Sequence, residues 1–190
     1  MFATRTEGPC LKWLKRAGTL LLGVLVLVGV VATVGLAMPE DHHAISSVEL
    51  ATPPDEVFAR ISDVANGARW RPSVQRVEIL ESVDGRQRFR EHADTGPLAM
   101  EIVELVRPRH MMTRIADNDL PFGGTWSWTI EPTTRGSRVT IEERGQIYNP
   151  IFRVVSRFAI GYNATMETYL LDLAASFDQP APPVTSSWSR

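Results

Sequence analysis

Two carboxylates are the strongest candidates for chemistry in this sequence. Glu143 follows the alternating apolar positions Val139 and Ile141, and Glu91 follows Phe89 in an earlier segment. Because side chains alternate between the two faces of a strand, each acid is expected to share a face with its apolar neighbours. An acid in such surroundings can act as a general acid or base, and its burial needs a raised pKa or a basic partner.

Arg114, on another strand-like segment, is the nearest basic residue of suitable type for that partner. The alternative is that each acid lies at a frayed strand end in water, and we favour it because acids are seldom fully buried. Glu143 and Glu91 therefore stand as catalytic candidates only if the protein is an enzyme.

Apolar and aromatic residues form a second candidate set, for ligand binding. Trp70 lies in a loop bounded by Gly67 and Pro72, where an aromatic ring can stack on a ligand, although anchoring a short helix on the core is the favoured role. Trp126 and Trp128 are expected in the core or in a pocket wall, and methionines can give an adaptable lining. The predicted ligand-binding residues are Trp70, Phe89, Met100, Met112, Arg114, Trp126, Trp128, Ile141, Phe158, Tyr162 and Met166.

Other kinds of site lack their sequence signals. The four histidines have no metal-ligand spacing, and neither a nucleophile motif nor a phosphate-binding glycine loop is present. Residues 40–190 hold 16 arginines and 21 acids, a net charge of −5, and a surface of this balance does not favour phosphate backbones. We predict no metal, no cofactor and no nucleic-acid partner.

Strands with alternating apolar residues, short helical segments near the start of the domain and one long helix at its end must position these residues. Residues 44–51 alternate as a strand, and Thr52-Pro-Pro-Asp55 predicts a helix, N-capped by Thr52, that runs to about Asp63. A short helical turn fits before Pro72. Further strand patterns follow at 74–82, 87–92, 98–106, 110–116, 126–130 and around 139–141, which makes about seven strands.

One long helix is expected to end the domain. Asn149-Pro150 supplies an N-cap and a first helical residue, and apolar residues recur every three or four positions from Ile151 to Phe177. Gly161 interrupts this pattern. Close packing of the helix on the sheet is the favoured reason, and a bend that admits ligand is the alternative.

The N-terminal part carries an apolar segment suited to a membrane. Residues 19–38 hold no charge, and about twenty such residues cross the hydrocarbon core as a helix. Basic residues precede the segment, so residues 1–18 are expected in the cytoplasm and the domain outside it, as a single-pass protein. The alternative is secretion after signal cleavage near Ala37.

The remaining chain divides into one domain, residues 40–178, and a tail. Residues 179–190 are rich in Pro and Ser and lack an apolar period, which predicts disorder.

Four places in this order resemble a known family. They are Ala51-Thr-Pro-Pro-Asp-Glu-Val-Phe58, Ile61-Ser-Asp63 with Trp70-Arg-Pro72, Gly124-Thr-Trp126 through Gly136-Ser-Arg-Val-Thr-Ile141, and the final helix. Together they resemble the SRPBCC superfamily of START-like, birch-pollen-allergen-like and polyketide cyclase/lipid-transport proteins. The resemblance implies an α+β helix-grip fold, a curved antiparallel sheet around a long C-terminal helix.

Three functions remain open. The resemblance and the aromatic residues favour a membrane-anchored, extracytoplasmic module that binds an apolar small molecule or lipid between the sheet and the last helix. A cyclase- or dehydratase-like enzyme that uses a pocket carboxylate is the first alternative. A structural or interaction module with a filled interior and an unknown protein partner is the second, because fold alone does not decide function.

Overall fold

The protein is described here by a computed structural model that covers residues 9–189. In chain order the elements are α1 (Pro9–Leu36), β1 (Asp41–Leu50), α2 (Pro54–Ser62), the 3₁₀ helix η1 (Val64–Arg69), β2 (Val74–Val83), β3 (Arg86–Ala93), β4 (Gly96–Val106), β5 (His110–Ile115), β6 (Phe122–Thr133), β7 (Gly136–Ile147), α3 (Pro150–Val155), the π-helical turn η2 (Ser156–Ile160), α4 (Ala164–Ala175) and β8 (Thr185–Ser189).

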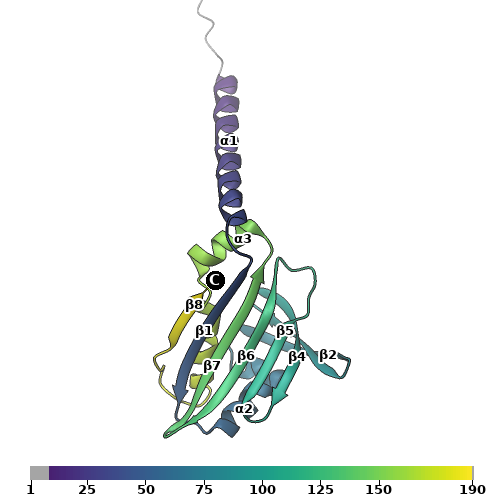
Figure 1. The fold of residues 1–190 in the computed structure, drawn as a ribbon. Helices are drawn as coiled ribbons and strands as arrows, with labels where there is room; N and C mark the ends of the chain where they lie inside the picture. Colours follow the sequence, from purple (N-terminus) through teal and green to yellow (C-terminus); the bar gives the residue numbers. More distant parts are fainter. Residues whose placement is uncertain (1–8, 190) are drawn as a thin grey trace, which may run out of the picture.

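All eight strands join one antiparallel sheet in the order β2-β3-β4-β5-β6-β7-β1-β8. Strands β2 to β7 form a meander, since each is joined to the next by a short connection, and β1 closes it by pairing with β7. Figure 1 shows the curved sheet with α2 behind it, and α2 and α4 contact β6, β7 and β1. The predicted α+β class and curved antiparallel sheet are confirmed.

Helix α2 forms where the sequence predicts it, with a different cap. Pro54 opens the helix and Asp55 lies in its first turn, where acids are favourable, but the N-cap residue is Pro53. Thr52 is buried instead, and its hydroxyl accepts a hydrogen bond from Gln179. The helix buries Val57, Phe58 and Ile61 in the core, on the side of the sheet that α4 also covers.

The predicted long C-terminal helix is divided into segments. Asn149 caps α3 as predicted, because its side chain accepts a hydrogen bond from the Phe152 N–H at 3.0 Å. The helix widens into η2 and then ends at Gly161, whose φ of +83° lies in the region that favours glycine. A Cβ at Gly161 would meet no atom within 4 Å, so close packing is not the reason for this glycine. The prediction of one long helix was wrong. The apolar spacing continues from Ile151 to Phe177, but the backbone leaves the helical conformation at Gly161.

Asn163 ties this interruption to the sheet. Its Nδ2 donates to the Ile45 carbonyl, the Ser187 carbonyl and the Ser46 hydroxyl at 2.9–3.1 Å. The side chain therefore joins the start of α4 to β1 and β8 together.

The Pro/Ser tail contains a strand that composition did not predict. Residues 185–189 pair with β1 as β8, and Trp188 packs against Tyr162 with ring centroids 5.4 Å apart. The strand forms at the free edge of β1, where backbone groups still lack partners. Because this pairing uses backbone groups at that edge, it does not need an alternating apolar pattern in the tail's own sequence.

Helix α1 stands apart from the domain (Figure 1). Its segment Lys15–Leu36 spans 22 residues with a mean hydropathy of 2.6. It is long and apolar enough to be a membrane span or a signal sequence.

Candidate functional site

The strand register places both candidate acids on the inner face of the sheet. Glu143 of β7 pairs with Trp126 of β6, and Glu91 of β3 lies in phase with buried Phe89. Glu91 is 8% exposed, and the Glu143 side chain is 21% exposed. The favoured expectation that both acids lie in water was therefore wrong. Each is instead paired with a cation or an imidazole.

Three tryptophan side chains gather around Tyr169 of α4, on the same side of the sheet. Trp70 meets the Tyr169 ring edge-on at 5.2 Å, and Trp128 and Trp126 lie 5.6 and 6.2 Å from it between ring centroids. Trp126 and Trp128 also contact each other at 5.8 Å. These are the separations at which aromatic pairs attract one another, so the rings form one connected cluster.

Arg71, rather than Arg114, is the partner of Glu91. The two guanidinium nitrogens of Arg71 donate to the two carboxylate oxygens of Glu91 at 2.5 and 3.0 Å. The Arg71 guanidinium also lies 5.0 Å from the centre of the Tyr169 ring. The short η1 helix and the turn after it carry Trp70 and Arg71 to this position, which gives the aromatic cluster a charged border.

Burial and neighbouring charges shift the pKa values of three side chains at this border. Burial acts to lower the pKa of Arg71, but the charge and hydrogen bond of Glu91 outweigh it and raise that pKa. Burial raises the pKa of Tyr169 well above its usual range, with Arg71 opposing the rise. Burial also raises the pKa of Asp172, again against the influence of Arg71. Arg71 therefore stays cationic and Tyr169 stays protonated at neutral pH.

A second polar group lies on the inner face at the start of β1. The His42 Nε2 lies 3.3 Å from a carboxylate oxygen of Glu143, and the His42 ring stacks on Tyr162 at 4.3 Å between centroids. His42 is 9% exposed. The sequence singled out Glu143 and Tyr162 separately, whereas His42 was noted only as a residue without metal-ligand spacing.

Some buried polar atoms of this region have no hydrogen-bond partner among the described residues. They include the indole N–H of Trp70 and the Nδ1 of His42. A buried donor without an acceptor is costly, so the indole N–H is a place where an acceptor from a ligand would be stabilised. The Nδ1 of His42 is an acceptor when the Nε2–H of the neutral ring donates to Glu143.

Two hollows open elsewhere, around the loop between β5 and β6. One of about 350 Å³ is lined by Arg114, Arg144 and Tyr148 among others. Another of about 400 Å³ includes Arg90, His92 and Leu120. Neither hollow is lined by the aromatic cluster.

The remaining predicted residues divide between the interior and the surface. Phe89, Ile141 and Met166 are buried in the core, and Met100 and Tyr162 pack against it. The prediction was wrong for Met112, Arg114 and Phe158, which do not face this interior.

Met112 and Arg114 alternate on β5 with buried Met111 and Thr113, and thus lie on the outer face. Arg114 binds Glu101 there at 3.1 Å. Phe158 is 72% exposed, because the helical phase changes in η2.

The described residues 9–189 contain no group of three or more His, Cys, Asp or Glu side chains placed to hold a metal ion. The chemistry of the inner face is therefore that of aromatic rings, two carboxylates, one guanidinium and one imidazole.

The sequence and fold were compared with known proteins. A family model described as polyketide cyclase/dehydrase and lipid transport matches residues 41–177. No curated protein matches the chain.

Solved structures share the fold at low sequence identity. The Zhui aromatase/cyclase from Streptomyces sp. R1128 has a TM-score of 0.59 and 16% identity, over 73% of this chain and 94% of that one. A START superfamily protein from Mycobacterium smegmatis has a TM-score of 0.58 and 16% identity, over 72% and 97%. The di-domain aromatase/cyclase StfQ of the steffimycin pathway has a TM-score of 0.59 and 14% identity, over 71% and 50%.

Proposed function

The chain belongs to the polyketide cyclase/dehydrase and lipid-transport family, and on that premise we propose that it binds an apolar, ring-containing small molecule on the inner face of its sheet. The ligand would lie against Trp70, Trp126, Trp128 and Tyr169. Burial of its apolar surface would supply most of the binding free energy, at about 25 cal/mol per Å².

One observation carries this proposal. The buried Trp70 N–H lacks an acceptor although the Trp70 ring packs against the Tyr169 ring. A ligand with a carbonyl or hydroxyl oxygen would provide that acceptor while its rings contact the aromatic cluster. Trp70 and Trp126 are only partly buried, so they are the side chains we expect to move aside when a ligand enters.

Two probes that differ by one oxygen test the acceptor. Tetralone carries a carbonyl beside its fused rings, whereas tetralin has the same rings without it. The full chain in mild detergent is titrated with each probe, and binding is measured by calorimetry. We expect Trp70→Phe, which removes the N–H and part of the ring, to weaken tetralone binding more than tetralin binding, with a difference of about ten-fold at most, as one hydrogen bond allows.

Trp13→Phe is the matched control, since Trp13 is exposed on α1 far from the cluster. Equal effects of Trp70→Phe on both probes would refute the hydrogen bond while keeping the apolar site. If neither probe binds the unmodified chain, and native mass spectrometry finds no co-purified apolar molecule, the binding proposal fails. A filled structural module would then be the better account.

We also propose that α1 anchors the domain in a membrane, with residues 1–18 in the cytoplasm and the domain on the other side. The charge asymmetry supports this orientation. A contact with the end of α1 supports retention of the helix over cleavage near Ala37, because Arg153 donates to the Gly35 carbonyl at 3.2 Å. Protease accessibility on intact and opened cells tests the topology; cleavage of the domain from the cytoplasmic side would overturn it.

His42 and Glu143 favour a second candidate, a cyclase- or dehydratase-like reaction. Their 3.3 Å contact joins a carboxylate to a buried imidazole on the inner face beside Trp126. A general base of this kind could remove a proton from the carbon next to a ketone, so that this carbon attacks a second carbonyl, and return the proton to the alkoxide that forms. Glu143→Gln should then abolish cyclisation of a linear β-polyketone thioester while retaining tetralone binding. Unchanged turnover in this variant would dismiss Glu143 as the base.

A further inference from the structure

An exposed apolar surface lies at the end of the domain nearest α1. Its side chains come from α3, η2, β8 and the connection after β7, and they include aromatic and aliphatic residues. They are Tyr148, Ile151, Val155, Phe158, Ile160 and Trp188, each between 38 and 72% exposed. Because large apolar side chains rarely gather on a surface without a partner, this patch calls for an occupant. We call it the α3–η2 surface.

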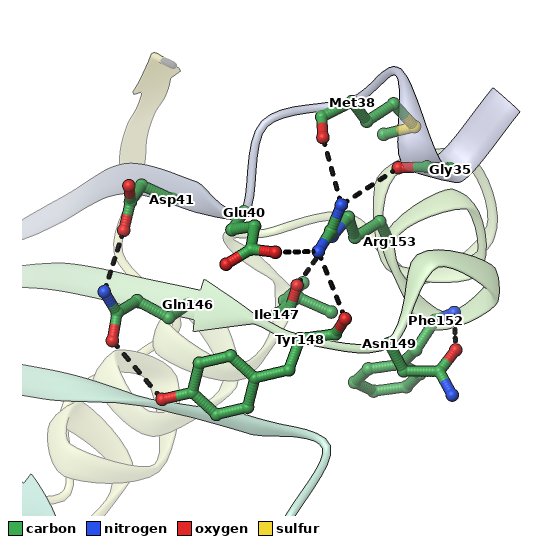
Figure 2. Close-up of polar contacts among 10 residues, drawn as sticks. All are labelled: Gly35, Met38, Glu40, Asp41, Gln146, Ile147, Tyr148, Asn149, Phe152 and Arg153. Carbon is green, nitrogen blue, oxygen red and sulfur yellow. Dashed lines mark hydrogen bonds and ion pairs between the residues drawn. The ribbon is translucent and has the colours of Figure 1, made fainter. Parts of the chain in front are cut away.

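Arg153 fixes this surface next to α1. Its side chain is 5% exposed and reaches from α3 to the chain between α1 and β1 (Figure 2). It donates to the carbonyls of Gly35, Met38, Ile147 and Tyr148 and to the carboxylate of Glu40. Two of these acceptors belong to the end of α1 and the turn beyond it, where carbonyls lack partners within the helix.

Close contact between α1 and α3 reinforces this joint. A Cβ at Gly35 would lie 1.9 Å from the carbonyl oxygen of Pro150, so the glycine permits the two helices to touch. Figure 1 shows α3 directly below the end of α1. Helix α3 therefore packs against the last turn of α1.

We infer that the α3–η2 surface lies in the headgroup region of the bilayer that α1 spans. This inference rests on the proposed anchoring by α1. The apolar face would be continuous with α1, of which only 6% is buried within the structure. Because α3 packs against the end of α1, a bilayer that α1 spans would lie beside this surface in every copy of the chain.

The chemistry of the surface agrees with a lipid occupant. Tyr148 and Trp188 are the residue types enriched at membrane–water boundaries, and Phe158 supplies an apolar ring beside them. The Arg157 guanidinium lies 4.9 Å from the Trp188 ring centre and 5.6 Å from the Phe158 ring centre. A cation held over these rings suits lipid phosphates just outside the hydrocarbon.

Depth-dependent fluorescence quenching tests this inference on the full chain. In a Cys10→Ser background, single cysteines replace Phe158, Val155, Leu25 or Glu131, and each carries an environment-sensitive nitrobenzoxadiazole dye. The proteins are reconstituted into vesicles of phosphatidylcholine and phosphatidylglycerol, with or without lipids that carry a nitroxide quencher on the acyl chain close to the headgroup. Leu25 reports on α1, and Glu131 is an exposed control toward the far end of β6.

We expect the labels at Phe158 and Val155 to be quenched with the Leu25 label, and the Glu131 label to be unaffected. If Leu25 is quenched but Phe158 and Val155 behave like Glu131, the anchor stands and this inference is overturned. If no label is quenched, anchoring fails and the inference fails with it. A dye at Phe158 that is shielded from water yet insensitive to quencher lipid would indicate a protein on this surface, which also overturns the inference.

Discussion

The Glu91 carboxylate and the Arg71 guanidinium, twenty residues apart in the chain, form a two-pronged ion pair against the Tyr169 ring. Their side chains are 11 and 17% exposed. The pair joins β3 to the turn that carries Trp70, so it orders one border of the proposed binding surface.

Removing one partner of this pair should be strongly destabilising. We expect Glu91→Gln or Arg71→Met to lower the free energy of unfolding by about 3–5 kcal/mol, because each leaves a charge buried alone. Urea unfolding of the full chain in mild detergent, followed by near-UV circular dichroism, measures the loss. The double variant Arg71→Met/Glu91→Gln should lose less than the sum of the two single changes. Additive losses would show that the two charges are independent.

The stability of the protein should decline in alkali partly because of Tyr169. Burial raises the pKa of Tyr169 above its ordinary value near 10, so the unfolded chain loses this proton at lower pH than the folded one. Folded protein then binds more protons, and stability falls as pH rises past about 10. Tyr169→Phe should flatten this part of the profile, measured as urea midpoints from about pH 8 upward. Phe retains the ring, so an unchanged alkaline slope would contradict the assignment.

Arg153 should hold the domain to the end of α1. Arg153→Gln removes the donors to several carbonyls and leaves Glu40 without its ion pair. We expect a loss of about 3 kcal/mol in the free energy of unfolding, from buried acceptors without partners. Arg138→Gln, at an exposed ion pair with Glu49, is the control and should cost under about 1 kcal/mol. A spin label at Glu131 should also become more mobile relative to one on α1.

The sign of the stability change in Gly161→Ala distinguishes a divided C-terminal helix from a continuous one. In the divided helix, Gly161→Ala should destabilise by about 1–2 kcal/mol, because alanine is strained at a φ of +83°. In one continuous helix the same change would stabilise by about 1 kcal/mol. Thermal unfolding measures the shift. Stabilisation would restore the continuous helix that the apolar period predicts.

Much of the inner face followed from strand alternation. Trp126, Trp128 and Ile141 could be assigned to one side because successive side chains point to opposite faces of any strand. The same rule placed Glu91 and Glu143 in phase with apolar neighbours. Met112 was assigned to the lining by its residue type alone, and the same alternation places it on the outer face.

The sequence by itself determined the order of strands and helices and the apolar N-terminal helix, since these depend on periodicity within short segments. The curved antiparallel sheet was implied by the family resemblance. Tertiary structure alone decided that Arg71 meets Glu91, that His42 meets Glu143, and that β8 pairs with β1. It also decided that Arg153 binds the end of α1. Such partners lie far apart in the chain or on different elements, and their contact depends on how turns and strand register place whole elements. Periodicity within a short segment does not specify that placement.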